Sequence, residues 1–215
     1  MCIRDRDNNT DTKSVQKSIY RNPHVVNVAL IYGIIGIAYI IQIIFIMSFM
    51  VESGINIIIA GQLMALNGIL SIFSGPIWGF ISDKIGRKKS LHITMALVLV
   101  AMCLPIVTPT LLGFTVHIIL LSCTLTGLFT LIQAACMDQV KPAHMPIAFS
   151  YATFYFASGQ LIGPTIAGFL IEDWGGFQGA FLFSSAFLAI GLLLTFKVRS
   201  NEEIADDLNE VQQAN

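Results

Sequence analysis

Charged residues are scarce in this sequence, and those present are confined to short stretches between long apolar runs. Only 12% of the 215 residues are charged, whereas 55% are hydrophobic, and the mean hydropathy is +0.74. A soluble domain of this length carries about twice that charged fraction. Long uncharged apolar runs instead predict an all-α membrane protein, because a helix satisfies its own backbone hydrogen bonds in hydrocarbon.

Other features are also missing, and each absence excludes a class of function. The four cysteines show no C-x-x-C spacing, so we expect no metal site, no disulfide framework and no cofactor. No sustained basic stripe is available for nucleic acid. No Asp, Glu, Lys or Arg lies near the middle of an apolar run, which argues against an intramembrane enzyme with paired aspartates and against a channel with an Arg-repeat sensor helix. We therefore expect a protein that is not an enzyme.

Six apolar runs are long enough, at about 20 residues, to span a bilayer. We expect them to form one bundle over residues 27–197, preceded by a segment 1–26 and followed by an acidic tail 198–215. Residues 1–6 resemble translated adapter sequence, so we expect a fragment whose true start lies upstream. The tail carries Ile204, Leu208 and Val211 at helical spacing, which predicts a short amphipathic helix. The predicted spans are Asn27–Val51, Ile57–Ile81, Leu91–Val107, Leu111–Met137, Met145–Ile171 and Phe177–Phe196.

The positions of the twelve Lys and Arg residues predict the orientation. They fall in the N-terminal segment, in the loops after the second and fourth helices, and in the tail. The other loops carry no Lys or Arg, and their only charged residues are Glu52, Glu172 and Asp173. Basic residues collect on the cytoplasmic side of a membrane. The sequence therefore predicts a multi-pass protein of the bacterial inner membrane with both termini in the cytoplasm.

The ends of the second and fifth helices share a local pattern. Residues 79–86 read GFISDKIG and residues 168–175 read GFLIEDWG, with both glycines, the Phe and one acidic residue in common. The second helix leaves the membrane on the opposite side from the fifth. A local design that occurs twice in opposite orientation predicts two inverted three-helix repeats.

The stretch 79–89, GFISDKIGRKK, carries the main functional signal. An ordinary basic loop explains its cations but not its spaced glycines and aspartate. We expect the glycines to permit close helix contact and a tight turn. The stretch resembles the major facilitator superfamily signature G-x-x-x-D-[RK]-x-G-x-[RK]-[RK] at every defined position. Its matching residues are Gly79, Asp83, Lys84, Gly86, Arg87, Lys88 and Lys89.

The resemblance implies the C-terminal six-helix half of a twelve-helix secondary transporter, which moves a small organic solute by alternating access. Two further segments, residues 32–39 with a Tyr-Gly-rich pattern and residues 159–164 reading GQLIGP, look like the YbfB/YjiJ-type branch. The implied partners are a small-molecule substrate, membrane lipid, and either the missing N-terminal half or a second copy of the chain. The alternative is a non-transporting or self-pairing six-helix membrane protein.

Polar residues within the helices are candidates for the substrate cavity, and each has an alternative structural role. Tyr32, Tyr39 and Gln42 share one face of the first helix, where the alternative is interhelical packing. His117 in the fourth helix either titrates near neutral pH or forms a helix–helix hydrogen bond. Asn67 and Gln160 complete the predicted cavity set.

Two further groups are predicted to act in conformational change. Gly159, Gly163 and Pro164 in the fifth helix suit close packing and a hinge, because Pro removes a helix hydrogen bond. Asp138, after the fourth helix, is expected near Arg87 or Lys84 as part of a charge latch. The alternative for Asp138 is a solvated loop carboxylate.

Overall fold

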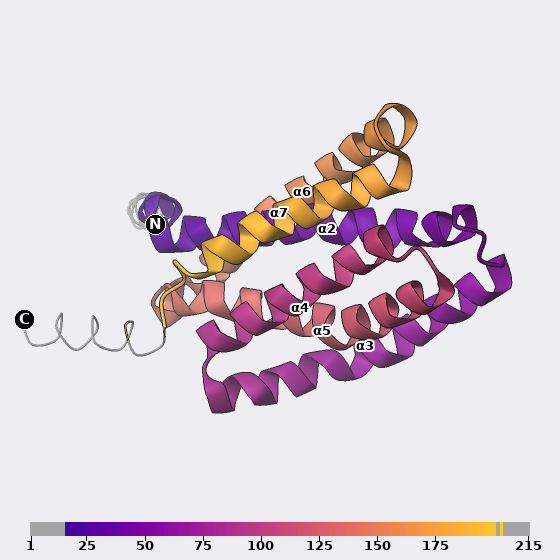
Figure 1. Ribbon diagram of the computed structural model, residues 1–215. Coiled ribbons are helices and arrows are strands. Elements are labelled where there is room, and N and C mark those ends of the chain that lie inside the picture. Colours follow the sequence, from indigo (N-terminus) through magenta and orange to yellow (C-terminus); the bar gives the residue numbers. More distant parts are fainter. Residues whose placement is uncertain (1–15, 201–202, 204–215) are drawn as a thin grey trace, which may run out of the picture.

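The structure is a computed structural model that describes residues 16–200 and residue 203 (Figure 1). Two predictions lie outside the described residues. These are the non-native start at residues 1–6 and the amphipathic pattern of Ile204, Leu208 and Val211.

The described residues contain six helices long and apolar enough to cross a membrane, which confirms the predicted fold class. A short 3-10 helix, Pro142–His144, joins the fourth of them to the fifth, and residues 16–21 are also helical. The six helices are α2 (Pro23–Glu52), α3 (Ile57–Ile85), α4 (Arg87–Val107), α5 (Leu111–Asp138), α6 (Met145–Asp173) and α7 (Gly176–Thr195).

Short polar residues begin several of these helices. Asn22 accepts a hydrogen bond from the backbone N–H of His24 at 3.0 Å, and Pro23 follows at the first helical position. Asn56 caps α3 and Thr110 caps α5 in the same manner. Side-chain caps satisfy backbone N–H groups that have no partner within the helix. The helices continue past the apolar runs into these polar ends, so α2 begins at Pro23 rather than at Asn27.

Successive helices run in alternating directions through the bundle. In Figure 1 the α3–α4 junction, the α5–α6 connection and both ends of the described chain lie on the left, and the remaining turns lie on the right. We call the left side the basic end, because Lys84, Arg87, Lys88, Lys89, Lys141, Lys197 and Arg199 lie there.

The helix contacts repeat with the symmetry expected of two inverted repeats. The two most extensive interfaces are α2 with α6 and α3 with α5. The next pairs are α4 with α5 and α2 with α7. Exchanging α2, α3 and α4 for α5, α6 and α7 converts each interface into its counterpart. The contact pattern therefore supports the repeat inferred from the matching helix ends.

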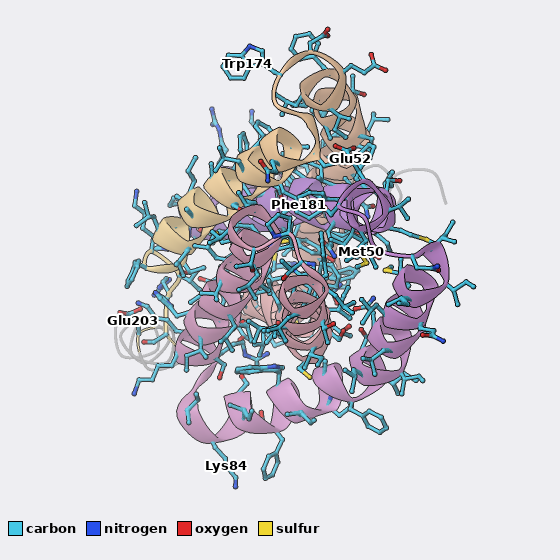
Figure 2. The ribbon with its side chains drawn as sticks, turned by 45° about the vertical axis from the view of Figure 1, so that its right-hand side comes forward. Met50, Glu52, Lys84, Trp174, Phe181 and Glu203 are labelled. Atoms are coloured by element: carbon cyan, nitrogen blue, oxygen red, sulfur yellow. The ribbon has the colours of Figure 1, made fainter. Side chains whose placement is uncertain are left out.

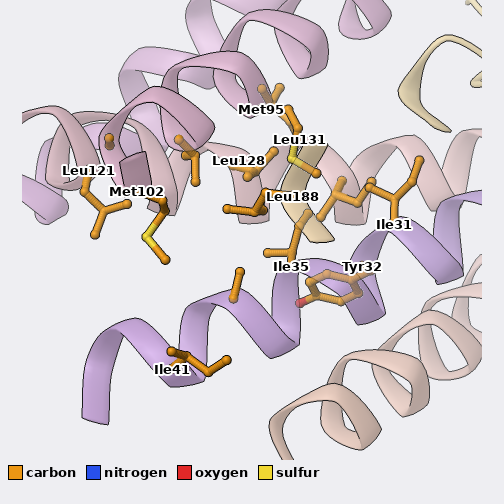
Figure 3. Close-up of a cluster of buried hydrophobic side chains, with 14 of the residues drawn as sticks. Ile31, Tyr32, Ile35, Ile41, Met95, Met102, Leu121, Leu128, Leu131 and Leu188 are labelled. Atoms are coloured by element: carbon orange, nitrogen blue, oxygen red, sulfur yellow. The ribbon is translucent and has the colours of Figure 1, made fainter. Parts of the chain in front are cut away.

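The core of the bundle lies between α2, α4, α5 and α7. Figure 3 shows Ile35, Met95, Leu128 and Leu188 converging from these four helices, and each is at most 1% exposed. Phe181 of α7, labelled in Figure 2, is fully buried. In lipid such a core is held mainly by van der Waals packing rather than by transfer from water.

The helices α3 and α6 are the least buried of the six. Large apolar side chains stand exposed along both, including Ile72 and Phe73 on α3 and Phe154 and Leu161 on α6. These two helices flank the face of the bundle formed by α2 and α5.

Candidate functional site

A cavity of about 360 Å³ opens between α2, α3 and α5. Its size falls within the range of small-molecule sites. No Asp, Glu, Lys, Arg or His lines it, so its chemistry comes from hydroxyl, amide and aromatic groups. The lining residues are Tyr39, Gln42, Ile43, Met64, Asn67, Gly68, Ser71, Leu121, Leu125, Thr126 and Phe129.

Three of the six residues predicted for the substrate cavity meet here, namely Tyr39, Gln42 and Asn67. Asn67 is held in place across the α3–α5 interface, because its Oδ1 accepts a hydrogen bond from Ser122 Oγ at 2.7 Å. Its Nδ2 group is thereby oriented away from Ser122. The structure brings these three side chains to one cavity, and their contact with a substrate stays a prediction.

Gln42 is the most buried polar side chain of the cavity wall. It is 4% exposed, and among the described residues its Oε1 has no hydrogen-bond partner. A buried amide oxygen without a partner costs about 1–3 kcal/mol. Gln42 therefore carries unused hydrogen-bonding capacity.

Tyr32 lies next to the cavity rather than in its lining. Its ring stacks on Phe156 of α6 with centroids 4.4 Å apart, and its hydroxyl accepts a hydrogen bond from Gln133 Nε2 at 2.8 Å. Tyr39 meets Phe129 edge to face at 5.1 Å, and Phe129 meets Phe156 at 5.5 Å. We call Tyr32, Tyr39, Phe129 and Phe156 the aromatic cluster.

His117 and Gln160 lie elsewhere. His117 is fully buried, and its Nδ1 lies 2.5 Å from the carbonyl oxygen of Ala101 in α4. This geometry matches the helix–helix hydrogen bond that was the alternative role for His117. Gln160 is partly exposed on α6 and does not line the cavity.

The sequence-based selection missed several residues of this site, above all on α5. Thr126 and Phe129 line the cavity, and Gln133 fixes the Tyr32 hydroxyl. A signal was present, because Ser122, Thr126, Phe129 and Gln133 recur at spacings of three and four residues and so share one helix face.

The signature loop is a tight junction between α3 and α4. Gly86 has φ of 89°, a left-handed conformation that favours glycine. Its N–H donates to Ser82 O at 3.0 Å to end α3, and α4 begins at the next residue. Arg87 Nε then lies 2.9 Å from Asp138 Oδ2, with both side chains 27% exposed. The ion pair joins the first repeat to the second, as expected for Asp138, and its role as a latch stays a prediction.

The remaining signature residues are more exposed. Lys84 Nζ lies 4.2 Å from the ring centroid of Phe80, one turn earlier in α3, and Figure 2 shows it pointing away from the bundle. Asp83 is exposed, and no cation of the described residues lies within ion-pair distance of it. A side chain at Gly79 would meet nothing within 4 Å. The close helix contact expected at Gly79 is therefore not made within the described part of the chain.

Gly159 and Gly163, two of the predicted hinge residues, lie where α6 approaches α2 closely. A Cβ at Gly159 would collide with the backbone oxygen of Gly33 in α2, and one at Gly163 would lie 2.6 Å from Ile40 Cγ2. These glycines let α6 approach α2. Pro164 follows inside α6, and its role as a hinge stays a prediction.

Six membrane-length helices, arranged as two inverted repeats around an uncharged polar cavity, define the architecture of a secondary transporter. Residues 28–213 match the Major Facilitator Superfamily. The chain belongs to this superfamily of membrane transporters, and it is not an enzyme. The resemblance to the YbfB/YjiJ-type branch stays a prediction.

Two curated relatives illustrate the relationship. The "Multi-drug resistance efflux pump PmrA homolog" of Lactococcus lactis subsp. lactis (strain IL1403) is 31% identical over 156 residues, which cover 70% of this chain and 37% of the relative. The "MFS-type transporter oryN" of Aspergillus oryzae (strain ATCC 42149 / RIB 40) is 25% identical over 108 residues, which cover 48% of this chain and 20% of that protein. The chain thus spans less than half the length of either relative.

Proposed function

We propose that this chain forms one six-helix half of a secondary active transporter, which carries a small organic solute across the membrane by alternating access. The observation that carries the proposal is the cavity between α2, α3 and α5. A site at the interface of inverted repeats is the arrangement that alternating access uses. The cavity is lined by three helices of a single bundle, and a second bundle packed over it would close it.

The proposed partner is an N-terminal six-helix half, or else a second copy of this chain. The low burial of α3 and α6 supports this, because they flank the cavity face and leave large side chains such as Phe73 and Phe154 exposed. The coverage of the relatives, at 37% and 20% of their lengths, agrees with a fragment. Membrane lipid would cover the remaining apolar surface.

We place the basic end in the cytoplasm of a bacterial cell, with both termini on that side of the inner membrane. The support is the uneven distribution of charge along the bundle. Cations of the α3–α4 junction lie at one end, and Glu52, Glu172 and Asp173 lie in the last turns of α2 and α6 at the other. Short loops follow the positive-inside rule closely.

In the transport cycle, the ion pair between Arg87 and Asp138 would close the basic end. It connects the start of α4 to the end of α5, and thus one repeat to the other. Rocking of the two bundles would change the distance between neighbouring helix ends, so a charge pair at this position favours one state over the other.

Uptake by the purified protein in liposomes tests the proposal. The gene sequence upstream of Met1 is first recovered, and the longer product is compared with the present chain. We expect the upstream frame to encode a second six-helix run, and only the longer protein to accumulate solute.

Cross-linking of the present chain distinguishes the two proposed partners from the non-transporting alternative. Solute accumulation by a cross-linked pair of the present chain would identify a second copy as the partner. An upstream frame without membrane helices, together with no uptake and no cross-linked pair, would leave a non-transporting six-helix protein and overturn the proposal.

A further inference from the structure

We propose that the cavity recognises an aromatic solute without negative charge, which packs against Tyr39 and Phe129 and hydrogen-bonds to the amide of Gln42. This inference rests on the proposed transport function and names the substrate class of that same cavity.

The part of the lining that this bundle contributes disfavours an anionic solute. None of the lining side chains carries a positive charge, and the cations of the described chain lie at helix ends, as Lys84 and Arg87 do. Moving an unpaired carboxylate or phosphate from water into such surroundings is costly. A neutral solute avoids this cost, and a delocalised cation offsets it through contacts with aromatic faces.

The aromatic cluster presents rings, held in place by neighbouring rings, against which a flat or ring-bearing solute can pack. Only Tyr39 and Phe129 reach the cavity lining. Behind them, Phe156 lies 6.2 Å from the Tyr39 ring and 5.5 Å from the Phe129 ring, and Tyr32 stacks on Phe156. Rings that are supported from behind lose little further freedom when a ligand binds. Edge-to-face and offset-stacked ring pairs add about 0.5–1.5 kcal/mol beyond the area they bury.

The amide of Gln42 supplies the polar contact. Gln42 also lines an apolar void of about 10 Å³, whose other walls include Val98, Met102 and Leu188. Tyr39 also lines this void and carries the one side-chain hydroxyl among its walls, but among the described residues Gln42 Oε1 has no hydrogen-bond partner. Gln42 lines the larger cavity as well as the void, so an N–H or O–H group of a solute in the cavity would satisfy this oxygen.

The charge and ring requirements are tested with two probes of matched shape and opposite charge. Tetraphenylphosphonium and tetraphenylborate are titrated onto the full chain in lipid nanodiscs, and binding to empty nanodiscs is subtracted. We expect saturable binding of the phosphonium only. The Phe129→Leu variant should weaken it about tenfold, whereas Phe169→Leu, which alters an exposed ring of α6 outside the cavity, should leave it unchanged.

The hydrogen bond is tested with a second pair of probes. 4-Phenylbutylammonium offers N–H donors, and its N,N,N-trimethyl derivative offers none. The Gln42→Leu variant should weaken binding of the first about tenfold and spare the second. The Gln62→Leu variant, which alters an exposed amide on α3 outside the cavity, should spare both.

The outcomes separate this inference from the function on which it rests. Tetraphenylborate binding as tight as that of the phosphonium, and weakened by Phe129→Leu, would overturn the substrate class while supporting the cavity. If Gln42→Leu weakened the binding of both phenylbutyl probes equally, the proposed hydrogen bond to Gln42 would be wrong. Absence of saturable binding by any probe would overturn the whole inference, whereas the proposed transport is judged independently by uptake with the longer reading frame.

Discussion

The ion pair between Arg87 and Asp138 joins the signature loop to the other repeat. Both side chains are 27% exposed, so water screens the pair only in part. Exposed ion pairs contribute up to about 1 kcal/mol, whereas loss of one partner of a fully buried pair costs about 3–5 kcal/mol. A partly exposed pair is expected between these limits.

We predict that Asp138→Asn lowers the free energy of unfolding by about 1–2 kcal/mol. The reason is that Arg87 loses its counter-charge while it stays partly buried. Chemical unfolding in detergent measures the free energy of the unaltered chain, of each single variant, and of the double variant with Arg87→Gln. These four values form a double-mutant cycle. Asp83→Asn is the matched control, because Asp83 is exposed and forms no ion pair within the described residues. Additive effects of the two changes would show that the pair contributes no coupling.

Contact between α2 and α6 depends on the absence of side chains. Gly33 and Gly36 on α2 face Tyr155 and Phe156 of α6, and Gly159 on α6 faces the backbone of α2 in return. Small residues on both helices permit the backbones to approach, which strengthens van der Waals contact in lipid. The α2–α6 pair is accordingly the most extensive interface of the bundle.

We predict that Gly159→Ala lowers the free energy of unfolding by about 1–3 kcal/mol, because the added methyl group forces the two helices apart. Gly168→Ala is the control on the same helix, since a Cβ there meets nothing within 4 Å. This second change should be neutral or should stabilise by up to about 1 kcal/mol through helix propensity. Thermal unfolding of the purified variants measures both. Equal effects of the two substitutions would contradict the packing argument.

The segment after α7 begins with a reciprocal capping arrangement. Ser200 N–H donates to Glu203 Oε2 at 2.7 Å, and Glu203 N–H donates to Ser200 Oγ at 3.3 Å. Glu203 Oε1 also lies 3.9 Å from Lys88 Nζ of α4. This pattern is a capping box, and it ties the start of the tail to the signature loop.

We predict a pH dependence for this capping box. The hydrogen bond from Ser200 N–H lowers the pKa of the Glu203 carboxyl below its usual value of 4.5. A carboxyl whose pKa is depressed on folding stabilises the fold above its unfolded pKa, and this contribution is lost as the pH falls through the folded pKa. Carbon NMR of the Glu203 carboxyl should therefore show a midpoint below 4.5. Ser200→Ala keeps the backbone N–H but removes the side-chain hydroxyl, which also lowers this pKa, so a smaller shift should remain. A midpoint at or above 4.5 in the unaltered chain would contradict the capping box.

At the scale of the whole molecule, the sequence predicts the helices well and the site only in part. Hydropathy identifies the six spans because uncharged runs of that length have no other stable form in lipid. Helix periodicity shows which residues share a face but does not show which neighbour that face meets. The helix α5 contacts α2, α3, α4 and α6, so His117 turns toward α4 while Phe129 reaches the cavity.

The packing of the bundle also explains why the aromatic cluster was not predicted. Tyr32, Phe129 and Phe156 belong to three helices that are far apart in the sequence. Their approach depends on the close contact at Gly33, Gly36 and Gly159, which is a property of the α2–α6 interface rather than of any single helix. Long-range contacts of this kind require the fold.

The central claim is that a transporter bundle holds its signature loop on the cytoplasmic side, and two-sided cysteine labelling tests it most directly. Lys89→Cys at the basic end and Gln178→Cys at the opposite end, both at exposed positions, are made after the four native cysteines are replaced. Intact cells are treated with a membrane-impermeant maleimide and compared with permeabilised cells. We predict labelling of the Gln178→Cys variant in intact cells, and of the Lys89→Cys variant only after permeabilisation. Labelling of the Lys89→Cys variant in intact cells, with the Gln178→Cys variant protected, would contradict the account.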